Sequence, residues 1–298
     1  MADAIRFFRQ KPLAAVATGV LVVIALASFL GPWLLPPSYA MTSPESFASP
    51  SWRHPFGTDL LGRDMFYRVL SGGQISLIVG MAGALVSLVI GTAYGLVAGY
   101  MGGRIDNMMM RIVDVLYSVP RLIFILVCIN AFNAKLQGLA ETLGLDWIVG
   151  SSRIVILVLS LGVIEWLTLA RIVRGQTLAL KNRAFVTAAV ALGQTTPVIM
   201  WRHILPNLIG VVLVYLTLTI PAVIIDESFL SFLGLGVQSP QASWGSLLAD
   251  GAGALNPLRI RWWLIVFPAG MMALTLLSLN LLGDALRDST DPKALKHK

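Results

Sequence analysis

Long apolar runs, each of a length that could cross a bilayer, constrain this 298-residue chain more than any other feature. A helix needs about 20 mostly apolar residues to cross about 30 Å of hydrocarbon. Charged residues make up only 12% of the chain, against about 25% in an ordinary soluble domain, which is too few to cover a soluble surface. The sequence therefore predicts an all-α polytopic membrane protein. Its six predicted transmembrane helices lie at about residues 13–35, 75–100, 105–132, 147–172, 208–225 and 262–282.

Two of these runs carry features that affect their interpretation. The first could be a cleaved signal peptide, because residues 38–40 loosely resemble a small-x-small cleavage site. It is longer than the apolar region of a signal peptide, and prolines intervene before the site, so we expect a retained span. The third run carries four charges in its first half, and we expect its embedded part to begin near Val113, with a bend at Pro120.

Lysine and arginine orient the six spans. If the N-terminus is inside, the inner segments hold about twice as many of these residues as the outer segments. This bias predicts a cytoplasmic N-terminus (1–12), a six-span domain (13–283) and a cytoplasmic tail (284–298). Within the domain it places loops 36–74 and 226–261 outside and loop 173–207 inside. The net charge of +7 then reflects orientation, and we expect no nucleic-acid partner.

Metal and redox sites are not indicated by the sequence. Cys128 is the only cysteine, so neither a disulfide framework nor a CxxC pair exists. His54, His203 and His297 are far apart in the chain and lack metal-ligand spacing. We therefore expect no metal site, and an intramembrane enzyme would need a catalytic set that the spans do not contain.

Small residues recur every fourth position along the second predicted span, at Ser87, Gly91, Gly95 and Gly99. These positions share one helix face, and small residues let helix backbones approach closely within lipid. We expect packing within this bundle, and a subunit interface or a pore-lining face is the alternative.

The inner loop 173–207 reads as a helix, a break and another helix. Residues 183–192 favour a helix, Gly193 suits its C-terminal cap, and Thr196 with Pro197 can start the next one. Phe185, Ala188, Ala189 and Leu192 share one face on which a partner surface could sit closely. We expect docking to another protein, and a helix lying on the membrane surface is the alternative.

This loop resembles the EAA motif of ABC importer permeases, in which an E-A-A triplet precedes a glycine and then I-x-L-P. The matching positions here are Thr187-Ala188-Ala189, Gly193 and His203-Ile204-Leu205-Pro206. The spacing is intact, but Thr187 replaces the glutamate and His203 replaces the isoleucine. The resemblance implies that residues 187–193 couple to an ATPase subunit and that residues 203–206 fix the return of the loop to the fifth span.

Further blocks are similar to the C-type permease of oligopeptide, dipeptide and nickel importers. They are HPFGTDLLGRD (54–64), GYMGGRID (99–106), SFLSFLGLG (228–236) and GDALRD (283–288). Within that family, ARIVRGQTL (170–178) and DESFL (226–230) look closest to the oligopeptide branch.

This resemblance implies a type I ABC importer permease in the bacterial inner membrane, with both termini cytoplasmic. Its expected partners are a homologous second permease, two ATPase subunits, an extracytoplasmic substrate-binding protein, the peptide and the lipid bilayer. ATP and Mg would be bound by the ATPases, and this chain would be neither an enzyme nor a cofactor carrier. Consistent with that division, the chain has no GxxxxGK[ST] phosphate loop.

Two kinds of alternative function stay open at this point. Within the family, the substrate could be a dipeptide, glutathione, a murein peptide or nickel. An ion-coupled secondary transporter is a remote alternative, since it would have polar residues at mid-bilayer and an inverted repeat.

Glu165 is the deepest carboxylate in the predicted spans, about 9 Å from Arg171 at 1.5 Å per residue along one helix. Ionisable groups within spans are costly and are therefore candidates for function. Glu165 could line the translocation path and meet a peptide amino terminus. The alternative is an ion pair with an arginine near the inner interface.

The outer segments hold a second group of charged candidates, for docking of the binding protein. In the 57–64 loop they are Asp59, Arg63 and Asp64, for which a loop-ordering salt bridge is the alternative. Asp226 and Glu227 end the fifth span and could instead form an interfacial cap. The apolar segment 229–236 that follows is too short to span and predicts a re-entrant or interfacial piece.

Overall fold

The computed structural model describes residues 11–34, 41–239, 241–255 and 259–290, and almost all of its regular structure is helical. The predicted termini therefore lie mainly outside the described residues. The elements are α2 (Pro12–Leu34), α3 (Met65–Met101), α4 (Gly103–Ser118), α5 (Arg121–Thr142), α6 (Asp146–Lys181), α7 (Ala184–Ala191), α8 (Thr196–Ile199), the π-helical turn η1 (Met200–Ile204), α9 (Leu205–Phe232), α10 (Trp244–Gly253) and α11 (Trp263–Thr290). The predicted all-α fold is confirmed.

Six helical segments of the described chain are long and apolar enough to cross a membrane, which matches the predicted number. They correspond to α2, α3, α5, most of α6, α8 through α9, and α11. Several are longer than predicted: α3 and α6 contain 37 and 36 residues. Helices of this length extend beyond a 30 Å hydrocarbon layer, so their polar ends reach into the loops.

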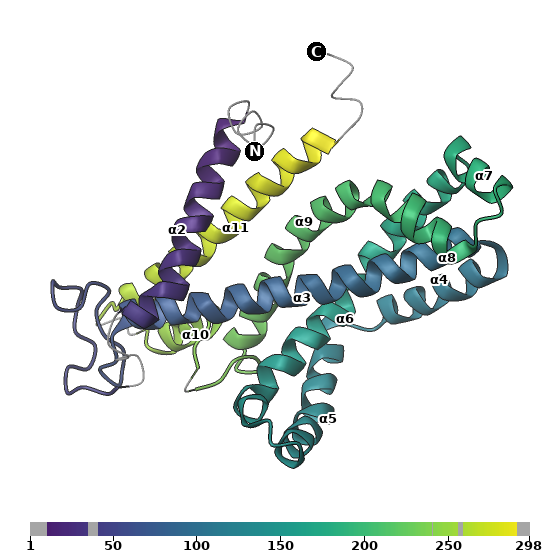
Figure 1. Ribbon diagram of the computed structural model, residues 1–298. Helices are drawn as coiled ribbons and strands as arrows, with labels where there is room; N and C mark the ends of the chain where they lie inside the picture. The colour runs from purple at the N-terminus through teal and green to yellow at the C-terminus, as the bar shows by residue number, and fades with distance from the viewer. Residues whose placement is uncertain (1–10, 35–40, 240, 256–258, 291–298) are drawn as a thin grey trace.

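The spans group into two arms that meet near the outer loop (Figure 1). One arm pairs α2 with α11, and the other packs α3, α6 and α9 together with α4 and α5. At the free end of the first arm, Lys11 Nζ lies 2.9 Å from Asp288 Oδ2 and donates to Ala285 O at 3.0 Å. The two ends of the described chain thus lie on one side of the bundle, as the even number of spans requires.

The small-residue stripe of α3 packs against α6, which confirms the expected packing within the bundle. A Cβ added at Gly91 would lie 2.9 Å from Leu169 Cβ, and one added at Gly99 would lie 2.7 Å from Arg174 O. Ser87 is fully buried at the same contact. α3 and α6 run in parallel, and close backbone approach is what joins them.

The third predicted span is wrong in its bounds. The chain breaks between Ser118 and Arg121, and Val119 has an extended conformation. Proline disfavours the helical conformation of the residue before it, so Pro120 separates two helices instead of bending one. The polar α4 precedes the break, and the apolar span is α5, Arg121–Thr142.

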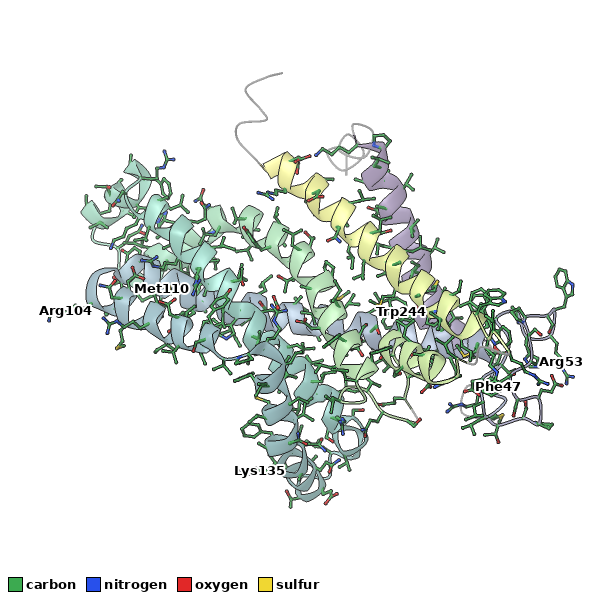
Figure 2. The ribbon with its side chains drawn as sticks, turned by 180° about the vertical axis from the view of Figure 1, so that it is seen from behind. Phe47, Arg53, Arg104, Met110, Lys135 and Trp244 are labelled. Carbon is green, nitrogen blue, oxygen red and sulfur yellow. The ribbon has the colours of Figure 1, made fainter. Side chains whose placement is uncertain are left out.

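The segment 229–236, predicted to be a re-entrant or interfacial piece, is not a separate element. α9 continues through Phe232, a turn follows with Gly234 at φ +75°, and the chain returns to form α10. Leu230 and Val237 lie in the core with residues of α3, α5 and α6. Trp244, at the start of α10, is fully buried and donates through Nε1 to Val69 O on α3, and Figure 2 shows it among the helices.

Candidate functional site

The inner loop forms the predicted helix, break and helix. α7 spans Ala184–Ala191, and Arg183 O accepts hydrogen bonds from the backbone N–H groups of Val186 and Thr187. Gly193 follows at φ +75°, the left-handed conformation that glycine adopts without a Cβ penalty. α8 then begins at Thr196 with Pro197 in its first turn. These signals are local, which is why they could be read from the sequence.

The exposed face of α7 differs from the predicted one at two positions, Ala189 and Val190. Ala189 is buried together with Val186, against residues of α3 and α6 that include Leu96 and Val173. Phe185 and Ala188 are exposed, and Leu192 is 80% exposed. Val190, which sequence reasoning missed, is also exposed. One face of α7 therefore packs against the bundle, and its other face exposes apolar side chains.

The return from this loop is held by side-chain contacts. His203 Nε2 lies 2.7 Å from Gln194 Oε1, which ties η1 to the segment just after α7. Ile204 is fully buried, Leu205 is half-buried, and Pro206 is exposed in the first turn of α9. The chain therefore has a polar contact at the position where the family motif has isoleucine.

The base of the loop is braced by contacts between α6 and its neighbours. Arg174 donates from Nε and Nη2 to the two carboxylate oxygens of Asp106 on α4, at 2.5 and 2.7 Å. Lys181 Nζ donates to Tyr100 O on α3 at 2.5 Å. A bidentate arginine–carboxylate pair fixes both partners in orientation. These contacts tie the end of α6, from which the loop leaves, to α3 and α4.

A charged triad joins three helices inside the spans. Arg121, at the start of α5, places Nη1 2.6 Å from Asp226 Oδ2 on α9 and Nη2 3.2 Å from Glu165 Oε1 on α6. The side chains of Glu165 and Asp226 are 10% and 15% exposed, whereas that of Arg121 is 47% exposed. Glu165 thus has the arginine partner considered above, but it is Arg121 of α5 and not Arg171 at the inner end of its own helix.

Half-exposed arginine is costly where it faces lipid, at about 2.5–3.5 kcal/mol even on the insertion-derived scale for a helix centre. The same exposure costs little where the arginine faces water or another protein. A cavity of about 300 Å³ opens beside Arg121, at the break between α4 and α5. This side of the bundle is therefore suited to an aqueous path or to a partner subunit.

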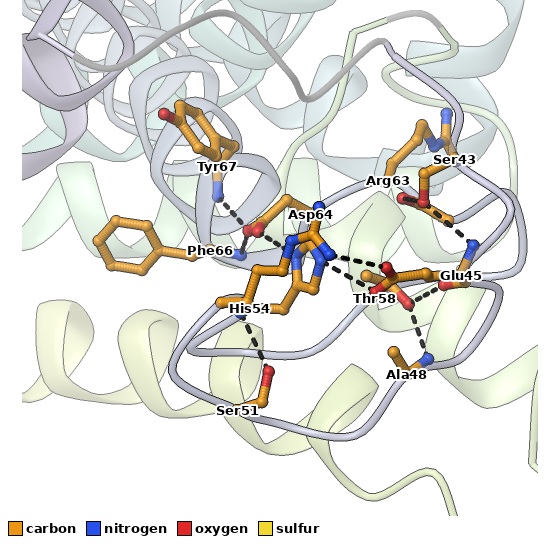
Figure 3. Close-up of polar contacts among 12 residues, drawn as sticks. Ser43, Glu45, Ala48, Ser51, His54, Thr58, Arg63, Asp64, Phe66 and Tyr67 are labelled. Atoms are coloured by element: carbon orange, nitrogen blue, oxygen red, sulfur yellow. Dashed lines mark hydrogen bonds and ion pairs between the residues drawn. The ribbon is translucent and has the colours of Figure 1, made fainter.

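The five outer candidates for docking are engaged inside the protein. Asp59 pairs with Arg63 at 2.6 Å and with the buried Arg68 at 2.9 Å. Asp64 caps α3 by accepting from Phe66 N, and its Oδ2 lies 2.8 Å from His54 Nδ1 (Figure 3). The two alternatives for this loop were docking of the binding protein and a salt bridge that orders the loop, and these contacts fit the salt bridge.

Glu227 is the most deeply placed of the five, with no exposed surface. It accepts hydrogen bonds from the hydroxyls of Ser231, Ser76 and Ser228, at 2.7, 3.1 and 3.3 Å. Ser76 Oγ in turn accepts from Trp244 N, at the first turn of α10. The carboxylate therefore fastens α9, α3 and α10 together, and it is not on a docking surface.

The outer loop exposes large apolar side chains in addition to the charged Glu45 and Arg53. Trp52, which precedes the Arg53 labelled in Figure 2, is fully exposed, and Leu60 and Leu61 of the same loop are exposed as well. Sequence reasoning favoured charged residues here and missed this set. Their exposure could have been suspected, because the loop is too polar to be a span and yet holds these large apolar side chains.

Six helical segments long and apolar enough to cross a membrane, with the two described ends on one side, define a multi-pass membrane protein, and α7 is a loop helix exposed at one end of it. Residues 91–296 match the family model described as the binding-protein-dependent transport system inner membrane component, and the chain belongs to this family. Residues 1–50 also match the N-terminal TM domain of oligopeptide transport permease C.

Three relatives are similar over nearly the whole chain. The oligopeptide transport system permease protein OppC of Haemophilus influenzae is 44% identical, covering 97% of this chain and 86% of its own length. That of Escherichia coli K12 is 45% identical, covering 98% and 90%. The dipeptide transport system permease protein DppC of Bacillus subtilis is 41% identical, covering 98% and 85%. The resemblance seen in the sequence motifs is confirmed.

Proposed function

We propose that this chain is the C-type permease subunit of an ATP-driven importer of oligopeptides. The observation that carries the proposal is the match to permeases named for oligopeptide transport, together with an exposed α7 at the position of the family's coupling motif. The chain supplies a path and no catalysis. A partner pair of ATPases binds ATP and Mg and performs the hydrolysis.

Coupling runs through the loop 173–207. The exposed apolar residues Phe185, Ala188 and Val190 of α7, with Leu192 directly after it, insert into a cleft of the ATPase. Closure of the ATPase pair moves this loop, and the braced base of α6 carries the movement into the bundle. The bundle then alternates access between the two faces, a population shift driven by nucleotide.

The assembly follows from this orientation. Both termini and α7 lie in the cytoplasm, and loops 36–74 and 226–261 face outward. A homologous permease completes the path, and an extracytoplasmic binding protein delivers peptide at the outer face, where Trp52, Leu60 and Leu61 are exposed. Glu165 lines the path as part of the triad, because Arg121 beside it is half-exposed within the spans.

The substrate is tested by whole-cell uptake. In a strain lacking this gene, we expect uptake of labelled peptides of three to five residues to be lost and to return with the wild-type chain. Nickel and dipeptide uptake measured in the same strains are the comparison. Restoration of nickel or dipeptide uptake, with oligopeptide uptake unaffected by the deletion, would assign the chain to another branch of the family.

A further inference from the structure

The cavity at the break between α4 and α5 is lined by hydrogen-bond donors. Its polar lining residues are Arg121, Tyr117, Ser118 and Thr168, of which Ser118 already donates its hydroxyl to Val115 O, and its volume is about 300 Å³. Among the described residues that line it, none is acidic. The apolar remainder comes from residues such as Phe124 and Leu167. This chemistry suits an anionic group on a partly apolar ligand.

The guanidinium of Arg121 is held in place by two ion pairs. Asp226 forms an ion pair with Nη1 and Glu165 forms one with Nη2, and these two carboxylates belong to different helices. Neither carboxylate lines the cavity, and both are largely buried. Arginine has five N–H donors, so these two ion pairs leave others available. An arginine fixed in this way is pre-organised to bind a further carboxylate.

We propose that Arg121 and this cavity receive the C-terminal carboxylate of the peptide during its passage. The inference rests on the proposed function and adds a contact within the path to it. A C-terminal carboxylate is common to peptides of every sequence, so a permease that moves varied peptides can use it. The hydroxyls of Tyr117 and Thr168 lie 2.5 Å apart and are hydrogen-bonded to each other beside the site, which leaves one of their two protons as a further donor.

The neighbouring carboxylates keep this contact weak. Two acids and one arginine leave the triad with a net formal charge of −1 when all three are ionised. The attraction of Arg121 for an anion is therefore reduced, and this is what a conduit requires, because a ligand that enters must also leave. The site would orient a passing peptide without retaining it.

The test compares a tripeptide free acid with the same tripeptide carrying a C-terminal amide. Uptake is measured in cells that contain the complete transporter, and the result is the ratio of kcat/KM for the two peptides. The binding protein contributes equally to this ratio in every permease variant, so a change in the ratio belongs to the permease. In Arg121→Gln we expect the preference for the free acid to fall about tenfold, since a charge-assisted contact is lost.

Lys135→Gln is the matched control, because it removes the same charge from the same helix. Lys135 is exposed at the far end of α5, as Figure 2 shows, and does not line the cavity. We expect its ratio to equal that of the wild type. An unchanged ratio in Arg121→Gln, or an equal fall in Lys135→Gln, would overturn the proposal.

A second variant keeps the proposal testable if Arg121→Gln does not assemble. Thr168→Val removes a donor from the cavity without touching the triad, and we expect a fall of about threefold in the same ratio, the loss of one hydrogen bond. An unchanged kcat/KM ratio in Thr168→Val would then overturn the proposal.

A peptide amide that contains an internal aspartate tests which carboxylate is bound. If this peptide is transported as well as the free acid, and loses that advantage in Arg121→Gln, the assignment to the C-terminus is wrong.

Failure of the proposed function gives a different result. If the wild-type chain does not support uptake of either peptide, the oligopeptide assignment itself is wrong. If both peptides are taken up and their ratio ignores Arg121, only the carboxylate site is wrong.

Discussion

Single residues carry charge into the interior of this bundle, and each is neutralised or solvated by groups that include at least one distant in sequence. Glu227 is surrounded by serine hydroxyls of α3 and α9. Arg121 meets carboxylates from two other helices. A buried charge is tolerated only where such partners are present. Sequence reasoning singled out Glu227 but missed Arg121, because the contacts of Arg121 with α6 and α9 depend on tertiary packing that local patterns do not encode.

Glu227→Leu is expected to destabilise the outer end of the bundle. The substitution removes the acceptor of three serine hydroxyls and leaves those donors buried. The expected loss of unfolding free energy is about 1.5–3 kcal/mol, the range for hydrogen bonds to a charged group. Thermal unfolding of the purified protein in detergent measures it. A variant as stable as the wild type would show that the serine contacts contribute little, and Glu227→Gln is the isosteric control.

Elements are positioned here by local signals where these are strong and by packing elsewhere. The cap at Gly193, the start of α8 and the face of the glycine stripe were all predicted correctly, because each depends on neighbouring residues. The bounds of the third span were predicted wrongly. Hydropathy merges α4 and α5 into one run, and only the effect of Pro120 on Val119 separates them.

The contact between α3 and α6 is tested by Gly91→Ala. A Cβ there would lie 2.9 Å from both Leu169 Cβ and Trp166 O, and the backbone oxygen cannot move aside. We expect a loss of about 1–3 kcal/mol, the cost of overpacking, measured by thermal unfolding in detergent. Gly19→Ala on α2 is the control, because nothing lies within 4 Å of its added Cβ. Equal losses of unfolding free energy at the two positions would contradict the close contact between α3 and α6.

The coupling role of α7 is tested by Ala188→Arg. Ala188 is exposed, so the bundle should tolerate the larger side chain while the apolar docking face is disrupted. We expect membrane abundance to be unchanged and peptide uptake to fall at least about tenfold, since loss of even 1.4 kcal/mol of docking energy weakens association tenfold. Thr187→Glu, which restores the family residue at an exposed position, should keep uptake. Normal uptake by Ala188→Arg would refute the docking assignment.

The whole molecule has its loop helix and its outer loop at opposite ends, and its orientation decides which end meets the ATPases. Arg53 and Arg104 mark these two ends in Figure 2. The described part of the chain also shows apolar side chains on outward faces of the spans, such as Val23 and Trp33 of α2. A lone chain does not cover these faces, which suits a protein that is surrounded by lipid and a second permease.

Orientation is tested by cysteine accessibility in a Cys128→Ser background. We expect Arg53→Cys to react with a membrane-impermeant maleimide added outside intact cells, and Arg104→Cys to react only after permeabilisation. The physical basis is the excess of lysine and arginine in the inner segments. The opposite labelling pattern would place α7 outside and out of reach of any ATPase.

The central claim is that ATP hydrolysis by partner subunits drives peptide through this chain. Its most direct test is accumulation of a labelled tripeptide in proteoliposomes that contain both permeases, with the ATPases and ATP inside and the binding protein outside. We predict accumulation that requires ATP, is independent of ion gradients and is lost when this chain carries Ala188→Arg. Accumulation driven by a proton or sodium gradient without ATP would contradict the account.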